Sequence, residues 1–374
     1  MKLSSVTTCI LAVLFLASCN SSNSTSDNGE SIEMRYSSLL ALHQCDGYIT
    51  AEIKNPWDTT KILHRYVLVD KDADMPAELP AGDVVKTPVS HAVYYTSVHV
   101  SLVNQLGGYN SIAGVCDHEY MYLDRLQQDV KSGKIVDCGK GISPDIEKII
   151  DLSPDAILVS PFENSGSYGK LGTLGIPVIE CADYMETSAL GRAEWMRFYG
   201  ILTGHQSQAD STFAGIEKRY NDLKTLVADV MTKPTVLSDM KFGNSWYVAG
   251  DNSTVGRLFA DAGADYIFND EKASGSVPYD PEVVFDRGQQ ADLWLIKYNQ
   301  AYDMTYALLA KEWGNYSRLS AFQHRNVYAC NLSKVPFYEE TPFHPDMLLR
   351  DYIIIFHPEA IKDHNLRYFK KIEK

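Results

Sequence analysis

The chain has 374 residues, and its 34 Lys and Arg against 48 Asp and Glu give a formal net charge of −14. A chain this acidic is a poor partner for nucleic acid and is not suited to lying flat on an anionic membrane. Its length is sufficient for two domains that each have a full hydrophobic core.

The first 18 residues have the features of a signal peptide. Lys2 supplies a positive start, and the apolar run at 9–17 is too short to span a bilayer. Residues 16–19 then read Leu-Ala-Ser-Cys, which matches the bacterial lipoprotein signal, in which the cysteine is acylated and becomes the new N-terminus. The alternative is a plain secretory signal with a chance cysteine. We expect Cys19 to be lipidated and to anchor the protein to a membrane.

Residues 19–36 are predicted to be a flexible tether, because residues 20–30 are almost all polar and cannot pack into a core. No later apolar run is long enough to cross a bilayer. The remaining cysteines are Cys45, Cys116, Cys138, Cys181 and Cys330. Their number is odd and no C-x-x-C pair occurs, so most are expected to be buried free thiols, with one bridge left open.

Residues 37–187 are predicted to form an N-terminal lobe of alternating strands and helices. Strands are expected at 48–53, 62–69, 91–95, 112–115, 156–159 and 178–181, and a helix is expected at 98–106. Thr96 and Ser97 are good N-cap residues for that helix, and Gly107-Gly108 closes it. This alternation favours a largely parallel sheet with helices on its faces.

Residues 188–232 are predicted to connect two lobes through a long helix. Residues 188–200 read as helical, and the following glycines loosen the chain. Apolar residues then recur at spacings of three and four, at Ala209, Phe213, Ile216, Tyr220, Leu223 and Val227. This pattern predicts one helix of roughly 25 residues, about 40 Å long at 1.5 Å per residue. Pro234 prevents its continuation, so we interpret the segment as a stiff connector.

Residues 233–374 are predicted to form a second lobe of the same kind. Strands are expected at 235–238, 291–296 and 327–329, and helices at 253–262, from Glu282 onward and at about 345–356. The alternation of strands and helices therefore resumes after the connector.

A short phrase occurs once in each lobe. Residues 143–147 read Ser-Pro-Asp-Ile-Glu, and a short helix and the strand 154–159 follow them. Residues 280–282 read Asp-Pro-Glu, and a similar helix and the strand 291–296 follow. In addition, 97–111 matches 253–267 at a constant offset. The repeat predicts an α/β protein with two Rossmann-like lobes, mainly parallel sheets, and a ligand cleft between the lobes.

Ligands of open α/β sheets bind beyond the carboxyl ends of the strands. The residues expected at these positions are Tyr94, Tyr95, Ser97, Lys140, Phe162 and Tyr184 in the first lobe and Lys241, Trp246, Lys297 and Tyr298 in the second. Aromatic side chains with a few cations suit a large, flat or apolar ligand with polar edges. The alternative is that many of these aromatic residues simply line cores or surfaces.

Two glutamates occupy matching places in the repeated phrases. Glu147 and Glu282 each fall in the first turn of a helix, which is predicted to begin at Ser143-Pro144 or at Asp280-Pro281. One interpretation is that they only complement the helix dipole. Their recurrence in both lobes favours a shared external role, as two anionic contacts for two cationic sockets.

Catalytic motifs are absent from the sequence. It contains no G-x-S-x-G, H-E-x-x-H, P-loop or G-x-G-x-x-G, and its ten histidines are scattered. We therefore expect no enzyme activity, no metal-ion site and no intrinsic cofactor. A lipid-anchored hydrolase is the alternative of a different class, although no nucleophile with a base supports it.

Taken together, these phrases resemble a known family. The chain is similar to the substrate-binding proteins of bacterial ABC importers for ferric siderophores, haem and cobalamin, in which one long helix joins two lobes. The phrases that carry the resemblance are 143–147, 152–158, 174–179, 191–195 and 260–264, within about residues 85–360. The strands at 48–53 and 62–69 lie outside it.

The resemblance implies a function. A ligand, which is a ferric siderophore, a cobalamin-type corrinoid or haem, would sit between the lobes and pass to a membrane permease driven by its ATPase. In such proteins one glutamate per lobe docks onto permease arginines, and by motif position these would be Glu147 and Glu282. The protein is expected to be a monomeric lipoprotein of the cell envelope, on the periplasmic face in a Gram-negative cell.

Overall fold

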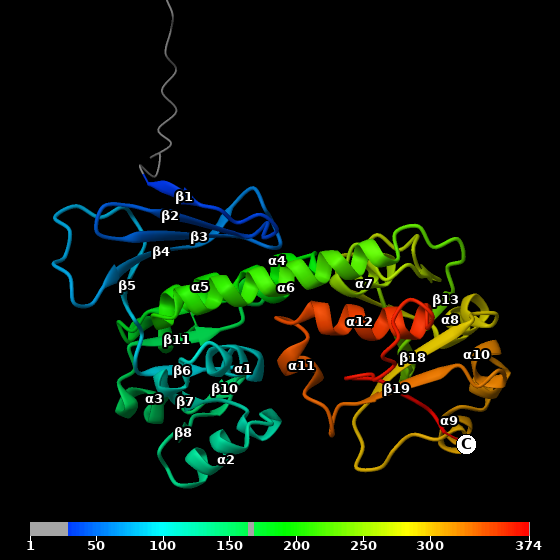
Figure 1. Cartoon of the computed structure of the whole chain (residues 1–374). Coiled ribbons are helices and arrows are strands. Elements are labelled where there is room, and N and C mark those ends of the chain that lie inside the picture. Colours follow the sequence, from blue (N-terminus) through cyan, green and yellow to red (C-terminus); the bar gives the residue numbers. More distant parts are fainter. Residues whose placement is uncertain (1–28, 164–167, 374) are drawn as a thin grey trace, which may run out of the picture.

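The computed structural model describes residues 29–163 and 168–373. It has a small N-terminal sheet, two α/β lobes, and a set of helices that runs across both lobes (Figure 1). The predicted signal peptide, Cys19 and most of the predicted tether lie outside the described residues. Within those residues, no helix is both long and apolar enough to cross a membrane.

The N-terminal sheet has five strands. They are β1 (Glu30–Ile32), β2 (Leu40–Gln44), β3 (Ile49–Lys54), β4 (Ile62–Asp70) and β5 (Asp83–Thr87). They lie in sequence order, and only the β4–β5 pair is parallel. The two strands predicted at 48–53 and 62–69 are confirmed, and they belong to a five-stranded sheet that was not predicted.

The prediction of a tether through residue 36 is wrong for its last part. Ser31 pairs with His43 in the β1–β2 ladder. The backbone N–H groups of Arg35 and Tyr36 then donate to the buried carboxylate of Glu194, at 2.9 and 2.8 Å. Polar residues are held here because buried acceptors elsewhere in the chain bind their backbone, which local composition does not reveal.

The N-terminal sheet covers an edge of the first lobe. The Tyr66 hydroxyl donates to the carbonyl of Val178 at 2.9 Å and accepts from the N–H of Glu180 at 2.8 Å. Both partners belong to β12 (Val178–Glu180), which is the edge strand of the first lobe's sheet. A single buried side chain therefore occupies backbone groups that would otherwise lie unpaired at a sheet edge.

The N-terminal lobe contains a five-stranded sheet that is parallel throughout. Its elements are β6 (Ala92–Tyr94), α1 (Ser97–Gln105), β7 (Ile112–Val115), α2 (Asp124–Lys131), β8 (Val136–Asp137), β9 (Gly139–Lys140), β10 (Ser143–Pro144), α3 (Ile146–Leu152), β11 (Ala156–Val159) and β12 (Val178–Glu180), with short 3₁₀ helices at Tyr109–Ser111, His118–Tyr120, Leu171–Thr173 and Ala182–Met185. The strand order is β12-β11-β6-β7-β8.

The connector is made of three helices. They are α4 (Ala189–Glu194), α5 (Met196–Thr203) and α6 (Gln206–Leu226). At 21 residues α6 is about 32 Å long, somewhat shorter than predicted. The break before it occurs at Gly204, which has a left-handed φ of 73°. Because α6 packs against both α5 and α12, the connector is part of the core (Figure 1).

The C-terminal lobe repeats the plan. Its elements are β13 (Thr235–Ser238), β14 (Lys241–Phe242), β15 (Ser245–Ala249), α7 (Thr254–Asp261), β16 (Asp265–Tyr266), β17 (Ser276–Tyr279), α8 (Pro281–Gly288), β18 (Leu293–Tyr298), α9 (Tyr306–Glu312), α10 (Ser320–Gln323), β19 (Val327–Asn331), α11 (Phe337–Glu340), α12 (Pro345–Phe356) and β20 (Lys370–Lys371), with a 3₁₀ helix at Gly314–Arg318. The main sheet has the order β16-β13-β18-β19-β20, and β14, β15 and β17 form a separate antiparallel sheet.

The two lobes share one strand order, since β7-β6-β11-β12 corresponds to β16-β13-β18-β19. The aspartate of the repeated phrase has the same contact in each. Asp155 accepts from the N–H and hydroxyl of Ser90, at 2.9 and 3.0 Å. Asp292 accepts from the N–H and hydroxyl of Thr235, at 2.8 and 2.7 Å. Part of the repeated phrase therefore reflects a structural contact that ties two adjacent strands together.

One detail of the repeat differs from the prediction. Ser143-Pro144 does not open a helix but forms β10, and α3 begins two residues later with Asp145 as its N-cap. The Asp145 side chain accepts from the N–H of Lys148 at 3.2 Å. Asp280 caps α8 in the other lobe, by accepting from the N–H of Glu282 at 2.8 Å.

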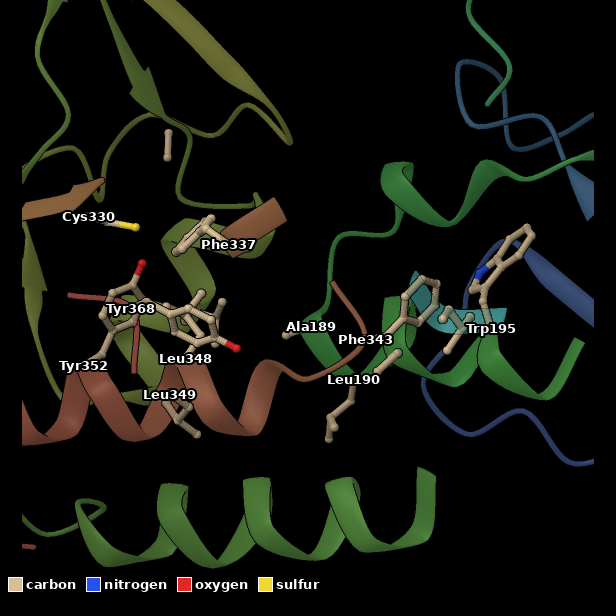
Figure 2. Packing of buried hydrophobic residues seen from close by; sticks show 14 of the residues in the cluster. Ala189, Leu190, Trp195, Cys330, Phe337, Phe343, Leu348, Leu349, Tyr352 and Tyr368 are labelled. Atoms are coloured by element: carbon tan, nitrogen blue, oxygen red, sulfur yellow. The ribbon is translucent and has the colours of Figure 1, made fainter. Parts of the chain in front are cut away.

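The core is continuous from the connector into the C-terminal lobe. Phe343 lies between them, with its ring centroid 5.8 Å from that of Tyr199 in α5 (Figure 2). Leu348 and Tyr352 of α12 continue the packing on the other side (Figure 2). This packing fixes the position of α4, whose side chains reach the cavity described next.

Candidate ligand-binding site

The largest cavity described has a volume of about 780 Å³ and lies at the carboxyl ends of β13 and β18. Its aromatic lining consists of Phe242, Tyr247, Tyr298, Phe337, Tyr338 and Tyr352. Its charged lining consists of Arg192, Asp239, Lys241, Lys297 and Glu312. We call this space the C-lobe cavity. Arg192 and Ala189 of α4 form its wall on the side of the connector.

A second cavity of about 700 Å³, which we call the N-lobe cavity, lies at the carboxyl ends of β6 and β11 in the other lobe. Its lining includes Tyr95, Thr96, Asp117, Ile142 and Phe162. A smaller space of about 200 Å³ lies between the lobes, lined from one side by Ser97, Tyr120 and Tyr122 and from the other by Asn299 and Tyr338 among others. The ends of the strands in both lobes are therefore hollowed, as open α/β sheets favour.

The structure divides the predicted ligand residues among these spaces. Lys241, Lys297 and Tyr298 line the C-lobe cavity, Tyr95 and Phe162 line the N-lobe cavity, and Ser97 lines the space between the lobes. Lys140 and Tyr184 are not among the described residues that line these three spaces. Lys140 pairs with Glu119, and the Tyr184 hydroxyl donates to the carbonyl of Pro161.

Two of the predicted ligand residues are core residues instead. Tyr94 is fully buried in β6, and its hydroxyl lies 3.0 Å from that of Ser111. Trp246 is fully buried, and its indole N–H donates to the carbonyl of Ser238 at 2.9 Å. Strand side chains alternate between two faces, so the residue next to each of them, Tyr95 or Tyr247, faces a cavity.

The sequence interpretation missed Arg192, Tyr247 and Tyr352 as cavity residues. The alternation of β15 offered a signal for Tyr247, because its neighbour Trp246 points into the core. No local pattern identifies Tyr352, which comes from the final helix, or Arg192, which comes from the connector.

The charged group of Lys297 forms an ion pair with another residue of the cavity, Asp239. Its ammonium lies 2.6 Å from Asp239 Oδ1. Burial alone would lower the pKa of Lys297, but the charge and hydrogen bond of Asp239, together with nearby Tyr352 and Tyr338, outweigh burial and raise the pKa. The Lys297 charge is therefore matched by a neighbouring carboxylate and is not free for a ligand.

The lobes contact one another directly at α11. The N–H of Tyr122 donates to Glu339 Oε1 at 2.9 Å, and the Tyr122 hydroxyl donates to the carbonyl of Leu332 at 2.5 Å. His344 Nε2 lies 2.5 Å from Gln105 Oε1. Burial raises the pKa of Glu339. α11 also packs against α1 of the first lobe (Figure 1), and its residues Phe337 and Tyr338 line the C-lobe cavity.

Glu147 and Glu282 are both exposed in the first turns of α3 and α8. Asn315 lies 3.4 Å from the Glu282 carboxylate. The five predicted thiols at 45, 116, 138, 181 and 330 are free, and all except Cys45 are buried. Within the described ranges, no group of three or more His, Cys, Asp or Glu residues is placed to hold a metal ion.

Relatives in archaea match much of this chain in sequence. An uncharacterized lipoprotein of Methanocaldococcus jannaschii is 24% identical over 97% of this chain and 94% of its own length. A cobalamin-binding protein of Halobacterium salinarum is 25% identical over 62% of this chain and 60% of its own length.

Solved structures share the fold. A periplasmic haem-binding protein from Pseudomonas aeruginosa superposes with a TM-score of 0.57 at 15% identity, covering 76% of this chain and 99% of that one. The molybdate-binding protein MolA from Haemophilus influenzae gives a TM-score of 0.60 at 14% identity, covering 75% and 90%. The sequence model of the periplasmic binding protein family matches residues 92–332, more than half of the chain. The chain therefore belongs to the periplasmic binding protein family.

Proposed function

We propose that this chain is the substrate-binding lipoprotein of an ABC importer. The protein captures a ferric siderophore or a cobalamin-type ligand and delivers this ligand to the membrane permease. It acts as a monomer, and lipid on Cys19 keeps it at the membrane. The observation that carries the proposal is the C-lobe cavity. Its volume of about 780 Å³ suits a compact organic ligand, since such sites commonly measure about 300–1,000 Å³.

The chemistry of the cavity supports a chelate as its occupant. Phe242, Tyr247 and Tyr338 are exposed aromatic side chains at its rim, and they offer flat faces to a large ring system. Tyrosine hydroxyls exposed in the cavity also favour haem as a second candidate, because a phenolate is an established axial ligand of haem iron. The archaeal cobalamin-binding relative supports the corrinoid alternative.

Binding is the first test of the proposal. The purified full chain is expected to bind one of ferric siderophores, haemin or cyanocobalamin stoichiometrically and without turnover, as measured by visible absorption and native mass spectrometry. Tyr247→Ala should weaken that binding roughly tenfold, because an aromatic contact contributes about 0.5–1.5 kcal/mol beyond its buried area. Tyr302→Ala is the matched control, since Tyr302 is 48% exposed against 47% for Tyr247 and does not line this cavity. Conversion of the probe to a product would contradict the proposal.

Docking is the second test. Glu147→Ala with Glu282→Ala is expected to leave ligand affinity unchanged and to reduce ligand uptake by cells at least tenfold, because exposed carboxylates fix the register of an interface more than they stabilise the ligand. Asp151→Ala with Asp286→Ala is the control. It removes the same charge from exposed positions of the same two helices. Equal loss of uptake in both double variants would show a general charge effect and remove the specific role of the glutamates.

A further inference from the structure

Arg192 is a charged residue of the C-lobe cavity that comes from the connector. It lies on α4, and its side chain lines the cavity together with Ala189 of the same helix. Most of the other lining residues belong to the C-terminal lobe. Arg192 therefore brings a group from the connector to a space that the second lobe builds.

A buried carboxylate holds the guanidinium from behind. Arg192 Nε donates to Asp183 Oδ2 at 3.0 Å, and Asp183 is fully buried. The other oxygen of Asp183 lies 3.1 Å from His99 Nε2 and accepts from the Tyr199 hydroxyl at 3.2 Å. Burial alone would raise the pKa of Asp183, but the charge of Arg192 and the hydrogen bond from His99 lower it. Asp183 is thus a fixed carboxylate that sets the orientation of the arginine.

The terminal nitrogens of Arg192 remain available. Nη1 and Nη2 have no protein acceptor within residues 29–163 and 168–373, and the side chain is 21% exposed at the cavity wall. A guanidinium offers these N–H groups in a rigid planar fork that matches two oxygens of a carboxylate or a phosphate. Since Asp183 fixes Nε, little side-chain freedom is lost when such a group binds.

Lys241 is a second cation that lines the cavity. Lys241 donates to the carbonyl of Gly243 at 2.9 Å and, in the described part of the chain, has no carboxylate partner. Lys297 differs, because Asp239 already neutralises it. Among the residues that the structure describes, Arg192 shares its charge with Asp183 but keeps its terminal N–H groups free, and Lys241 keeps a charge that no carboxylate matches. These two cations can therefore bind an anionic group of an occupant.

We infer that the occupant of the C-lobe cavity carries an anionic oxygen group, a carboxylate or a phosphate, which the Nη groups of Arg192 bind. Lys241 supplies a second contact, and Asp183, His99 and Tyr199 are positioning residues. This inference rests on the proposed function and narrows it to acidic chelates. A neutral chelate would leave the arginine fork desolvated and unpaired, which selects against it.

The test uses two probes that share one ring and differ in whether its two carboxylates are free or esterified. Haemin carries propionates, whereas its dimethyl ester presents the same ring without them. Arg192→Gln in the full chain is expected to weaken haemin binding by roughly 10- to 100-fold and to leave binding of the ester within about twofold. Arg125→Gln, which removes an exposed arginine of α2, should change neither. Equal effects on both probes, or no effect on haemin, would overturn the inference.

The positioning role has its own readout. Tyr199→Phe removes only the hydroxyl that donates to Asp183. It should reduce the ratio of haemin affinity to ester affinity, whereas a merely structural role would lower both affinities together. Arg192→Lys keeps the charge without the fork and is expected to restore only part of the ratio.

Failure of the proposed function gives a different result from failure of this site. If the chain binds neither porphyrin, ferric citrate, with its carboxylates, and cyanocobalamin, with its single phosphodiester, replace them as probes that carry an anionic oxygen group. If no chelate binds, the proposed ligand class is wrong, and metal-free citrate then tests the site alone. Citrate should raise the melting temperature of the wild type and not that of Arg192→Gln. An equal rise in both proteins would overturn the inference.

Discussion

Replacing Glu186 by alanine is expected to destabilise the whole protein, with a loss of about 3–5 kcal/mol in the free energy of unfolding. Its buried carboxylate accepts from five donor groups: the hydroxyls of Ser37 and Ser38, the N–H groups of Ser38 and Leu39, and the indole of Trp195. Alanine leaves these donors without their acceptor, and the bonds from the N–H of Leu39 and the indole of Trp195 are buried. At roughly 2–4 °C per kcal/mol, the melting temperature should fall by about 10 °C.

The same variant should release the segment at 35–39. We expect faster proteolytic cleavage there, because Glu186 and Glu194 together hold the backbone of Arg35 through Leu39. Glu33→Ala, which removes an exposed glutamate just before this segment, is the control and should melt within about 1 °C of the wild type. An unchanged melting temperature in Glu186→Ala would refute this account of how the N-terminal segment is attached.

The second large effect is expected at Trp246. Its ring lies 5.7 Å from Tyr316, 6.2 Å from Trp313 and 6.3 Å from Trp294. Trp246, Tyr316 and Trp294 are fully buried, and Trp313 is partly buried. Trp246→Ala leaves a cavity there and also removes the hydrogen bond to Ser238, so it should cost about 3–5 kcal/mol of stability. Denaturant unfolding followed by tryptophan fluorescence measures the loss.

Phe242 provides the contrast to Trp246. It belongs to the strand paired with β15, but it is 81% exposed at the rim of the C-lobe cavity. Phe242→Ala should change stability by less than about 0.5 kcal/mol and weaken ligand binding instead. If Phe242→Ala destabilised the protein as much as Trp246→Ala, the division between core and cavity aromatics described above would be wrong.

Much of the fold could be predicted because it depends on local patterns. The expected strand at 156–159 is β11, the helix at 345–356 is α12, and the apolar face from Ala209 to Tyr220 is buried along α6. Periodicity, caps and helix-ending residues are all encoded within a few positions of one another. The repeated phrase indicated two lobes for the same reason.

The N-terminal sheet could not be predicted in full. β1 has three residues and its surroundings are polar, so no hydrophobic alternation marks it. Pairing with β2 holds β1. Two buried glutamates, more than a hundred residues later, hold the residues at 35–39 that follow it. Composition describes only what a segment could do alone, and this segment is ordered by distant partners.

The candidate site was predicted only in part because strand ends do not show which face a side chain takes. In a parallel sheet both faces are covered, so Tyr94 in the core and Tyr95 at a cavity look alike in sequence. Arg192 lies in the phrase 191–195, but nothing in that phrase indicates that its side chain reaches a cavity. Its role depends on Asp183 and His99, which the fold brings to it from two other elements.

The attachment of the N-terminal segment sets an order in which contacts can form during synthesis. In each lobe, the hydrogen bonds of the repeated aspartate join residues that are fairly close in sequence. Asp155 and Ser90 are 65 residues apart, and Asp292 and Thr235 are 57 apart. Arg35 and Glu194 are 159 residues apart. The segment nearest the predicted lipid anchor is among the first parts made, yet it cannot be fixed until the connector has emerged. The N-terminal segment is therefore synthesised well before the glutamates that bind it. Contacts between residues so far apart in sequence slow folding.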